Sequence, residues 1–597
     1  MNNLYKIFLF IISIHILTSC EDILDKQPLD IMSDAVVWED EVLIDAYLTE
    51  QYAQMYVFSN ETGGDDHSGN GELWFAPYVV NNVSDECKAN WWKGLGMQKK
   101  YGTLNVTGGL LEWWEQAYVI NRALNIFIEK IKTAPVNENF RVQRSAEARF
   151  LRAFNYFYLV KRYGGVPIIT EAKGIDDEGI YVERDKEQDV YDFILSEMAA
   201  IKNDLPEANS KDDYGRPTQY VALALRCRAA LYAASIAKYG TIKLEGLVGI
   251  DNAKASEYYQ MAYDAAYDII KSDNFELYDE QEDKAVNFQT LFLTKNKEVM
   301  FVKQHNSLNK GDGGNGWAYD FMQTPLPNAW GGGNQDGVYL EMVEEFEYLD
   351  GTPGKLDTTE INGHLWTTDL LWKNKDPRFF ASIYTMNTLW NGAPIDWHYG
   401  VRALDGSLIT SGSYEGVLAN GNQRTSNGTG FGVKKYLKEG HDVMTARGTS
   451  DQAFIMFRYG EVLLNYAEAA FELGGEMDEA LWAVDEIRAR AGIATLQSMG
   501  KPITLEAIRH ERKVELAFEG HRYWDLRRWR TAENELSRTF SGLRHIYDYA
   551  TGKLELMVIE NVDGENNIPA FYEQNYYLPI TIARTGINPN LIENPGY

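Results

Sequence analysis

Cysteine is scarce in this sequence. The chain has 597 residues and only three cysteines, which excludes the disulfide scaffold on which many small secreted domains depend. Cys87 and Cys227 leave one disulfide open. Cys227, however, stands among Ala and Leu of a predicted helix, where cysteine usually acts as a small buried apolar residue.

Positive charge is also in short supply. The sequence holds 57 Lys and Arg against 87 Asp and Glu, a formal net charge of -30. A surface of this sign repels a phosphate backbone, so nucleic acid is not expected as a partner. The same sign mildly favours a neutral over an acidic ligand.

Long apolar runs are missing beyond the first twenty residues. The run from Ile7 to Leu17 follows Lys6 and is too short to span a bilayer, which is typical of a signal peptide. Leu17-Thr18-Ser19-Cys20 resembles the lipobox that bacterial lipoprotein signal peptidase reads. We therefore predict a signal peptide over 1–19 and a mature chain that lipids on Cys20 tether to the membrane.

Two acidic residues follow the predicted lipid anchor. Glu21 and Asp22 resemble the surface-export signal of Bacteroidota lipoproteins. The resemblance implies an outer-membrane protein displayed on the cell surface.

Catalytic and cofactor motifs are absent from the sequence. His510-Glu511-Arg512-Lys513-Val514 lacks the second histidine of H-E-x-x-H, and neither G-x-S-x-G nor a P-loop occurs. The run 311–316 matches G-x-G-x-x-G formally, but no helix is predicted to follow it, so no dinucleotide or other cofactor is expected. Calcium binding by this Asp- and Asn-rich run stays open, although the ligand spacing of an EF-hand is missing.

Helical periodicity dominates the rest of the chain. Apolar residues at three- and four-residue spacing predict amphipathic helices over 40–57, 112–132, 139–162, 187–204, 218–238, 254–271, 453–473, 477–491 and 504–530. Alternating small and large apolar residues, such as Ala153 and Phe154, suit close helix packing. The fold class is therefore predominantly all-α, with tetratricopeptide-like helix pairs forming one scaffold.

Two long segments interrupt this pattern. Between 58 and 110 and between 275 and 450, Gly, Asn, Asp and Trp replace the helical spacing, and short strands such as 298–304 are expected. The length of the chain allows one very large domain or two to four ordinary ones. Long ordered loops on a rigid scaffold are common places for ligand binding.

Tryptophan is concentrated in these insertions. Regions 60–100 and 310–400 hold nine of the fifteen tryptophans. Flat aromatic faces beside amides suit the apolar faces of sugar rings and their hydroxyls, although each ring could instead pack its own loop. The candidate ligand-binding residues are Trp74, Asn90, Trp91, Trp92, Trp317, Tyr319 and Trp330.

The C-terminal block carries a family resemblance. From Arg512 the chain follows the pattern R-x-x-E-L-x-x-E-G-x-R-x-x-D-L-R-R-W, whose dense opposite charges at helical spacing favour ion pairs. This pattern resembles the signature of the SusD/RagB family. Further agreement comes from the lipobox, the lead 23–28, the helix 144–163 followed by Gly-Gly-Val-Pro, and the ends 577–580, 588–591 and 594–597.

The resemblance implies a non-enzymatic outer-membrane lipoprotein with a single domain over 20–597. This domain would comprise N-terminal helical repeats over 20–271 with the insertion 58–110, a variable ligand-binding insertion over 275–450, and C-terminal helices and a tail over 453–597. Such proteins sit on a SusC-like TonB-dependent transporter and help to capture glycans, or in some members peptides. The signature residues are structural in that family, so no binding role is carried onto 506–530. The leading hypothesis is glycan capture, and the alternatives are a peptide-binding lid and a surface glycosidase.

Overall fold

The structure is a computed structural model, and parts of the chain are left out of its description. It describes residues 34–55, 78–89, 105–107, 111–174, 179–306, 317, 319–325, 334–357, 361, 363–421, 428–440, 450–564 and 568–597. The predicted signal peptide and Cys20 lie outside these residues.

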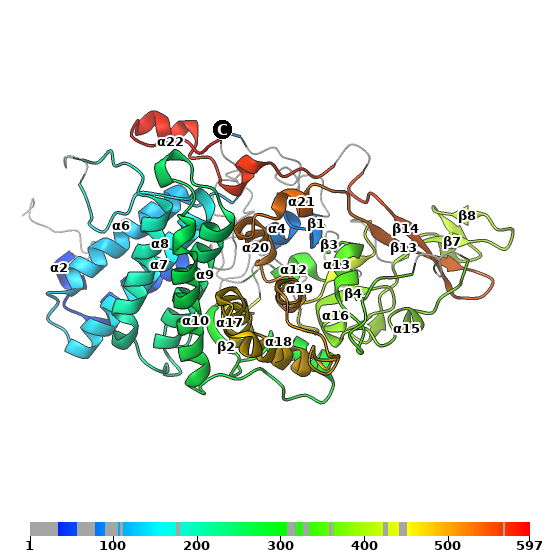
Figure 1. The fold of residues 1–597 in the computed structure, drawn as a ribbon. Helices are drawn as coiled ribbons and strands as arrows, with labels where there is room; N and C mark the ends of the chain where they lie inside the picture. Colours follow the sequence, from blue (N-terminus) through cyan, green and yellow to red (C-terminus); the bar gives the residue numbers. More distant parts are fainter. Residues whose placement is uncertain are drawn as a thin grey trace, which may run out of the picture.

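A row of long helices forms one half of the molecule (Figure 1). After the short α2 (Asp34–Val37) come α3 (Glu41–Gln54), α6 (Trp114–Ile131), α7 (Glu138–Tyr163), α8 (Glu187–Ile201), α9 (Gln219–Tyr239) and α10 (Ala255–Lys271). From α6 to α10 each helix packs on the next, and α10 packs on α17 (Tyr459–Leu473), which packs on α18 (Met477–Ala491). The predicted scaffold of tetratricopeptide-like pairs is confirmed.

Local signals explain the bounds of these helices. The Asn137 side chain accepts hydrogen bonds from the backbone N–H groups of Asn139 and Phe140 and so caps α7. The apolar stripe of this helix is buried, and Phe154 stacks on Phe457 with ring centroids 5.4 Å apart. The N-cap and the apolar stripe both depend on residues within or next to the helix. The predicted range 139–162 therefore falls within one residue of the observed helix at each end.

Within the described part of the chain, one helix is long and apolar enough to cross a membrane. This is α9, and 94% of its apolar window is buried inside the protein.

Short strands organise the other half of the molecule. One antiparallel sheet has the order β1 (Cys87–Ala89), β3 (Asp336–Val338), β11 (Phe431–Val433) and β4 (Ile383–Thr385). A second has the order β14 (Leu554–Ile559), β13 (Gly542–Asp548), β7 (His398–Arg402) and β8 (Leu408–Ile409), in which β7 and β13 are parallel. Three two-stranded pairs join β2 (Val299–Lys303) to β12 (Phe454–Arg458), β5 (Leu389–Trp390) to β6 (Ala393–Pro394), and β9 (Ser413–Tyr414) to β10 (Val417–Leu418).

Short helices fill the spaces between the strands. They are α4 (Tyr78–Asn82), α11 (Lys284–Leu291), α12 (Tyr319–Gln323), α13 (Leu340–Glu345), α15 (Thr368–Leu371), α16 (Pro377–Ser382) and α21 (Ala532–Leu536). The last helix, α22 (Ile582–Ile587), lies over the helical row instead, where Arg584 pairs with Glu112 and Glu115 at the start of α6 (Figure 1). Although α4 and β1 come from the N-terminal part of the chain, they lie beside the C-terminal α20 (Arg522–Arg528) (Figure 1).

Two predicted helix ranges are wrong. The predicted helix 453–473 begins with β12, whose five residues are all buried, and a continuous apolar run fits a buried strand as well as a helix. The predicted helix 504–530 is α19 (Leu505–Glu515) followed by α20, because Phe518 and Gly520 adopt positive φ angles of 63° and 80° between them. The C-terminal region contains the hairpin of β13 and β14 as well as helices.

The insertion tryptophans include several core residues. Trp372, Trp390 and Trp397 are 4%, 3% and 1% exposed. The concentration of tryptophan between 310 and 400 therefore reflects in part the packing of these rings in the hydrophobic core, which continues from the helical row into the strand-rich half.

Buried ion pairs fasten α19 to the rest of the molecule. Glu515 is fully buried, with Oε1 2.7 Å from Arg458 and Oε2 3.0 Å from Arg378, and it also pairs with Arg490. Arg458 in turn contacts Glu298, 2.8 Å away. An ion pair at the helical spacing predicted for the signature does form between Asp525 and Arg528. The pairs of Glu515 instead reach Arg378, Arg458 and Arg490 outside the signature, and these long-range pairs join the helical row to the strand-rich half.

Arginine neighbours keep Glu515 ionised. Burial alone would raise the pKa of Glu515, but Arg490, Arg458 and Arg378 outweigh it and hold the pKa well below its usual range. A carboxyl with a lowered folded-state pKa adds stability above its unfolded pKa, and this contribution is lost as the pH falls below about 4.5.

We predict that Glu515→Gln lowers the free energy of unfolding at pH 7 by about 3–5 kcal/mol, because buried arginine charges lose their counter-ion. Urea unfolding measures this change. Glu506→Gln, at an exposed position on the same helix, is the matched control and is expected to change stability by less than about 0.5 kcal/mol. Equal effects of the two substitutions would contradict the structural role of the network.

Candidate functional site

The described residues beside the predicted ligand-binding loops come together on one sheet. Ala89, which precedes Asn90, pairs in register with Asp336, which follows the segment 326–333 closely. The hydroxyl of Tyr384 on β4 donates to the backbone oxygen of Gln323 on α12 at 2.6 Å. The described residues that flank the segments carrying Trp91, Trp92 and Trp330, which we call the roots of these segments, therefore lie in one region.

Most of the candidate residues lie beyond these roots. Trp74, Asn90, Trp91, Trp92 and Trp330 are outside the described residues, and their role stays a prediction.

Trp317 and Tyr319 are part of the core. Trp317 is 3% exposed and Tyr319 is 0% exposed. Their rings stack with centroids 4.8 Å apart, and the ring of His305 lies parallel to Trp317 at 5.4 Å. Tyr436 meets Trp317 edge-on at 5.6 Å. This burial argues against sugar-stacking roles for Trp317 and Tyr319, which act as packing residues at the root of the insertion.

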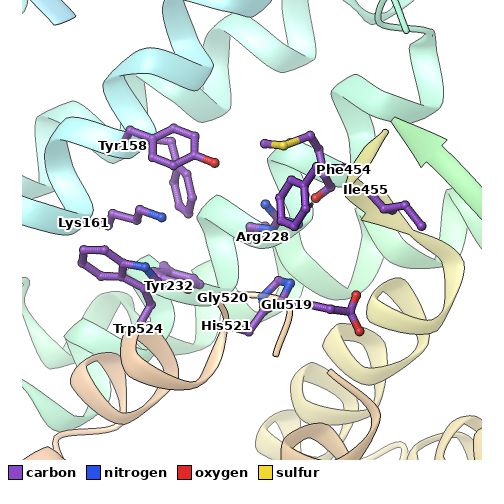
Figure 2. A pocket seen from close by; sticks show the side chains of 12 residues that line it. Tyr158, Lys161, Arg228, Tyr232, Phe454, Ile455, Glu519, Gly520, His521 and Trp524 are labelled. Carbon is purple, nitrogen blue, oxygen red and sulfur yellow. Dashed lines mark hydrogen bonds between the residues drawn. The ribbon is translucent and has the colours of Figure 1, made fainter. Parts of the chain in front are cut away.

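A small cavity lies where α7, α9, β12 and the turn before α20 meet (Figure 2). Its volume is about 30 Å³, which is room for about one water molecule and far too little for a sugar ring. Figure 2 shows the side chains that surround it, including Tyr158, Lys161, Arg228, Tyr232, Phe454, Ile455, Glu519, His521 and Trp524.

The basic groups around this cavity have structural contacts. Arg228 lies 3.8 Å from the centroid of Phe457 and 2.5 Å from Glu461. Lys161 lies 4.4 Å from the ring of Trp524. Burial, reinforced by Arg228 and other arginines, holds the pKa of His521 well below its usual range, so this imidazole is neutral. The cavity thus lies between the helical row and the segment that carries the signature, and its basic groups serve packing and ion pairing there.

Two larger open hollows have the size of ligand pockets. One, of about 510 Å³, is lined by tyrosines, including Tyr239, Tyr576 and Tyr577, together with Arg530. The Arg530 Nη2 donates to the Tyr577 hydroxyl at 2.7 Å, and the ring of Tyr572, 56% exposed, lies at the edge. This combination of rings and polar groups was not predicted, although the run Tyr576-Tyr577 was visible in the C-terminal motif.

The second hollow, of about 970 Å³, lies between α13, α18 and α19. Both charge signs line it, with Glu344 and Glu345 facing a set that includes Arg488, Arg509 and Lys513. Lys513 pairs with Glu345 at 2.9 Å, so part of this charge is already satisfied within the protein.

The described cysteines and histidines give no sign of a reactive thiol or a metal site. Cys87 and Cys227 are both buried and are not joined to each other, so the disulfide that the sequence left open is not formed. Burial raises the pKa of Cys227 to about 12, which disfavours the nucleophilic thiolate. Across the described ranges, no group of three or more His, Cys, Asp or Glu side chains is arranged to hold a metal ion.

Comparison with known proteins settles the family. The model of the SusD family matches residues 297–597, and a second model, described as starch-binding associating with outer membrane, matches residues 22–231. The chain belongs to the SusD family. The first match includes α19, α20 and the signature.

Individual SusD-family relatives align along most of the chain. A SusD-like protein of Formosa agariphila is 24% identical over 557 residues, covering 88% of this chain and 91% of its own. The starch-binding protein SusD of Bacteroides thetaiotaomicron is 22% identical, covering 79% of this chain and 76% of its own. The crystal structure of a SusD-like protein from Bacteroides fragilis has a TM-score of 0.71 at 24% identity and covers 96% of this chain and all of that one (100%).

Two neighbouring acidic residues join β1 to the SusD signature. Asp85 pairs with Lys513 at 2.9 Å and with Arg522 at 2.8 Å. Glu86 accepts from the backbone N–H of Phe518 at 2.9 Å and thereby supports the positive-φ turn between α19 and α20. Burial, aided by the charge of Asp85, raises the pKa of Glu86 to about 7.

The raised pKa of Glu86 predicts a pH-dependent stability. Between its unfolded value near 4.5 and about 7 the folded state holds the proton more tightly, so Glu86 lowers stability as the pH rises through this window. Glu86→Gln keeps an acceptor for Phe518 and removes the titration. We compare the free energy of unfolding of Glu86→Gln with that of the native chain by urea unfolding. The difference in favour of the variant is expected to be about 2 kcal/mol larger at pH 8 than at pH 5.

The exposed substitution Glu39→Gln provides the comparison for this experiment. A stability difference between Glu86→Gln and the native chain that is the same at both pH values would show that Glu86 does not titrate in this window.

Proposed function

We propose that this protein is a surface-exposed lipoprotein that captures oligosaccharides or polysaccharides and delivers them to a SusC-like TonB-dependent transporter. It acts by binding rather than by hydrolysis. The lipid on Cys20 is its only membrane attachment in this proposal.

Membership of the SusD family carries the proposal. The two family models together reach from residue 22 to residue 597, and the description of the second names both starch binding and the outer membrane. The relative from Bacteroides thetaiotaomicron is itself named a starch-binding protein. A neutral glycan also fits the net charge of -30.

The proposed glycan site is formed by the insertion segments that carry Trp74, Asn90, Trp91, Trp92 and Trp330. Indole faces suit the apolar faces of sugar rings, and the Asn90 amide can both donate to and accept from hydroxyls. Their roots meet at the sheet that contains β1 and β3, which supports a single site fed by several segments.

Peptide capture is the main alternative. In that case the same aromatic rings would anchor side chains and the backbone of an extended peptide. A surface glycosidase is a more distant alternative, since it needs a carboxylate pair that turns over substrate. The class of ligand and the presence of products separate the three.

The first test is calorimetric binding of a soluble form that begins at Glu21 to a panel of neutral glycans, acidic glycans and a peptide digest, with analysis of products. We expect binding to one class of neutral glycan without new reducing ends. We further expect the double substitution of Trp91→Ala and Trp92→Ala to weaken that binding at least tenfold, because the indole faces that stack on sugar rings are lost. The melting temperature is expected to stay within about 2 °C of the native value.

Tyr572→Ala is the matched control, since it removes an exposed ring from the 510 Å³ hollow. If this variant loses binding and the tryptophan variant does not, the ligand occupies the hollow. Binding confined to peptides would replace glycan capture by peptide capture, and released oligosaccharides would overturn the binding role.

The lipid anchor has a separate test. We expect Cys20→Ala to release the protein from the outer-membrane fraction into a soluble one, because the acyl chains that hold it are no longer attached. Cys87→Ala, which alters a buried cysteine, is the control and should leave the protein in the membrane. Retention of the Cys20 variant in the outer membrane would refute lipid anchoring through this residue.

A further inference from the structure

His398, a buried residue at the start of β7, connects the second sheet to the hairpin of β9 and β10. The residue is 4% exposed. Its Nδ1 lies 2.6 Å from Oδ1 of Asp396, and its Nε2 lies 2.7 Å from the backbone oxygen of Leu418 on β10. Both ring nitrogens therefore face an acceptor.

Two acceptors require two donors. A neutral imidazole carries a single N–H and can donate to only one of the two oxygens. Neither an ionised carboxylate nor a backbone carbonyl has a proton to give in return. The geometry therefore fits the imidazolium form of His398, for which the partly exposed Asp396 side chain is the counter-ion.

The other titratable groups described around the ring leave this charge in place. From β13, His545 pairs in register with His398, and the ring centroid of Tyr547 lies 5.9 Å from that of His398. Burial lowers the pKa of His545 to about 4, so its imidazole is neutral at pH 7. Arg402, further along β7, is paired with Glu555 of β14 at 2.8 Å.

The surroundings of His398 also favour its protonated form energetically. Burial alone would lower the pKa of His398, but the hydrogen bonds to Asp396 and Leu418 and the charge of Asp396 together raise the pKa above its usual value. The folded chain thus holds the proton more tightly than the unfolded chain does. Stability from this proton is complete below the unfolded value near 6.5 and is lost as the pH rises through the folded value.

The hairpin is a locally ordered unit with its own turn. Among the described strands, β9 and β10 pair only with each other. Glu415 and Gly416 form the exposed two-residue turn, with φ angles of 48° and 84° that suit the twist of the strands. Attachment to the second sheet therefore depends on contacts outside this ladder. His398 makes two of them, through Leu418 and through its own backbone oxygen, which accepts from the N–H of Gly421 at 2.9 Å.

Loss of the ring proton breaks the side-chain contact to the hairpin. The carboxylate of Asp396 is the stronger acceptor, so the one remaining N–H stays on Nδ1 of His398. Nε2 then turns a lone pair toward the Leu418 oxygen, and two acceptors at this distance repel each other. Leu418 is 52% exposed, so its carbonyl can bond to water once the hairpin moves away.

We propose that His398 is a pH-sensitive latch, which holds the hairpin of β9 and β10 on the second sheet while the imidazole is protonated and releases it when the proton is lost. Trp397, next to His398, packs on Tyr384 of β4 with ring centroids 5.2 Å apart, and the chain that leaves the hairpin leads to β11 of the same sheet as β4. Release therefore loosens a segment that continues into the sheet at which the roots meet.

The first test needs no glycan, so its result is independent of the proposed function. Hydrogen exchange of the amides in 410–421 is measured in the full-length protein, purified in detergent, at pH 6 and pH 9, and is compared with His398→Gln, which cannot take up a proton. We expect the native protection factor to exceed that of the variant at least threefold at pH 6 and to fall to that of the variant or below it at pH 9. His364→Gln, at an exposed histidine, is the matched control and should behave as the native chain.

The charge state of the ring has its own test. In protein labelled with carbon-13 at the histidine rings, the NMR resonance that His398→Gln removes is expected to titrate with a midpoint above about 6.5. Asp396→Asn is expected to move this midpoint to lower pH, because the counter-ion is lost. A midpoint at or below about 6.5, or equal protection of 410–421 in the native chain and His398→Gln at pH 6, would overturn the latch.

Discussion

A buried carboxylate that stays ionised must be matched by positive charge, and this requirement governs how the two halves of the molecule meet. Glu515 and Glu519 on and after α19 are matched by Arg458, which stands at the junction of β12 and α17. Arg378 extends the same network to the short helix α16. A removed partner leaves a desolvated charge, so the residues of the network depend on one another far more than separate apolar contacts would. The helical row therefore has one fixed orientation relative to the strand-rich half.

The long helices could be predicted closely from the sequence, and the break in the signature could not. Helix α7 carries its own cap at Asn137 and its own apolar stripe, so all the information lies within its range. The turn at Phe518 depends instead on a hydrogen bond from its N–H to Glu86, more than four hundred residues earlier in the chain. A helical pattern of residues continues across that turn, because α19 and α20 both bury apolar faces. The residues next to Phe518 in the sequence therefore do not indicate that its N–H bonds to Glu86.

The site was less predictable than the fold, because residue type does not reveal which way a side chain faces. Tryptophan is suited both to sugar stacking and to core packing, and Trp317 does the second. The root of the insertion is also assembled from distant segments, since Asn82 donates to Asp336 and the backbone N–H of Asp336 donates to Gln323, and no spacing in the sequence marks these contacts. The tyrosine-lined hollow is likewise assembled from the end of α9, the segment after α20 and the C-terminal tail. The hollows of this structure are assembled from segments far apart in the sequence, whereas the helices of its scaffold follow from local patterns of residues.

The pairing of Asp85 with Lys513 and Arg522 has a consequence for how the chain reaches its native state. Asp85 and Lys513 are separated by 428 residues, and Asp85 and Arg522 by 437. During synthesis or export the N-terminal segment emerges long before its partners, and α4 and β1 have no completed place to dock until the signature follows. Closure of this part of the core is therefore a late step with a large loop to close. A chain that ends before α19 leaves the buried carboxylate of Asp85 without Lys513 and Arg522, so this part of the core cannot form until both residues have been made.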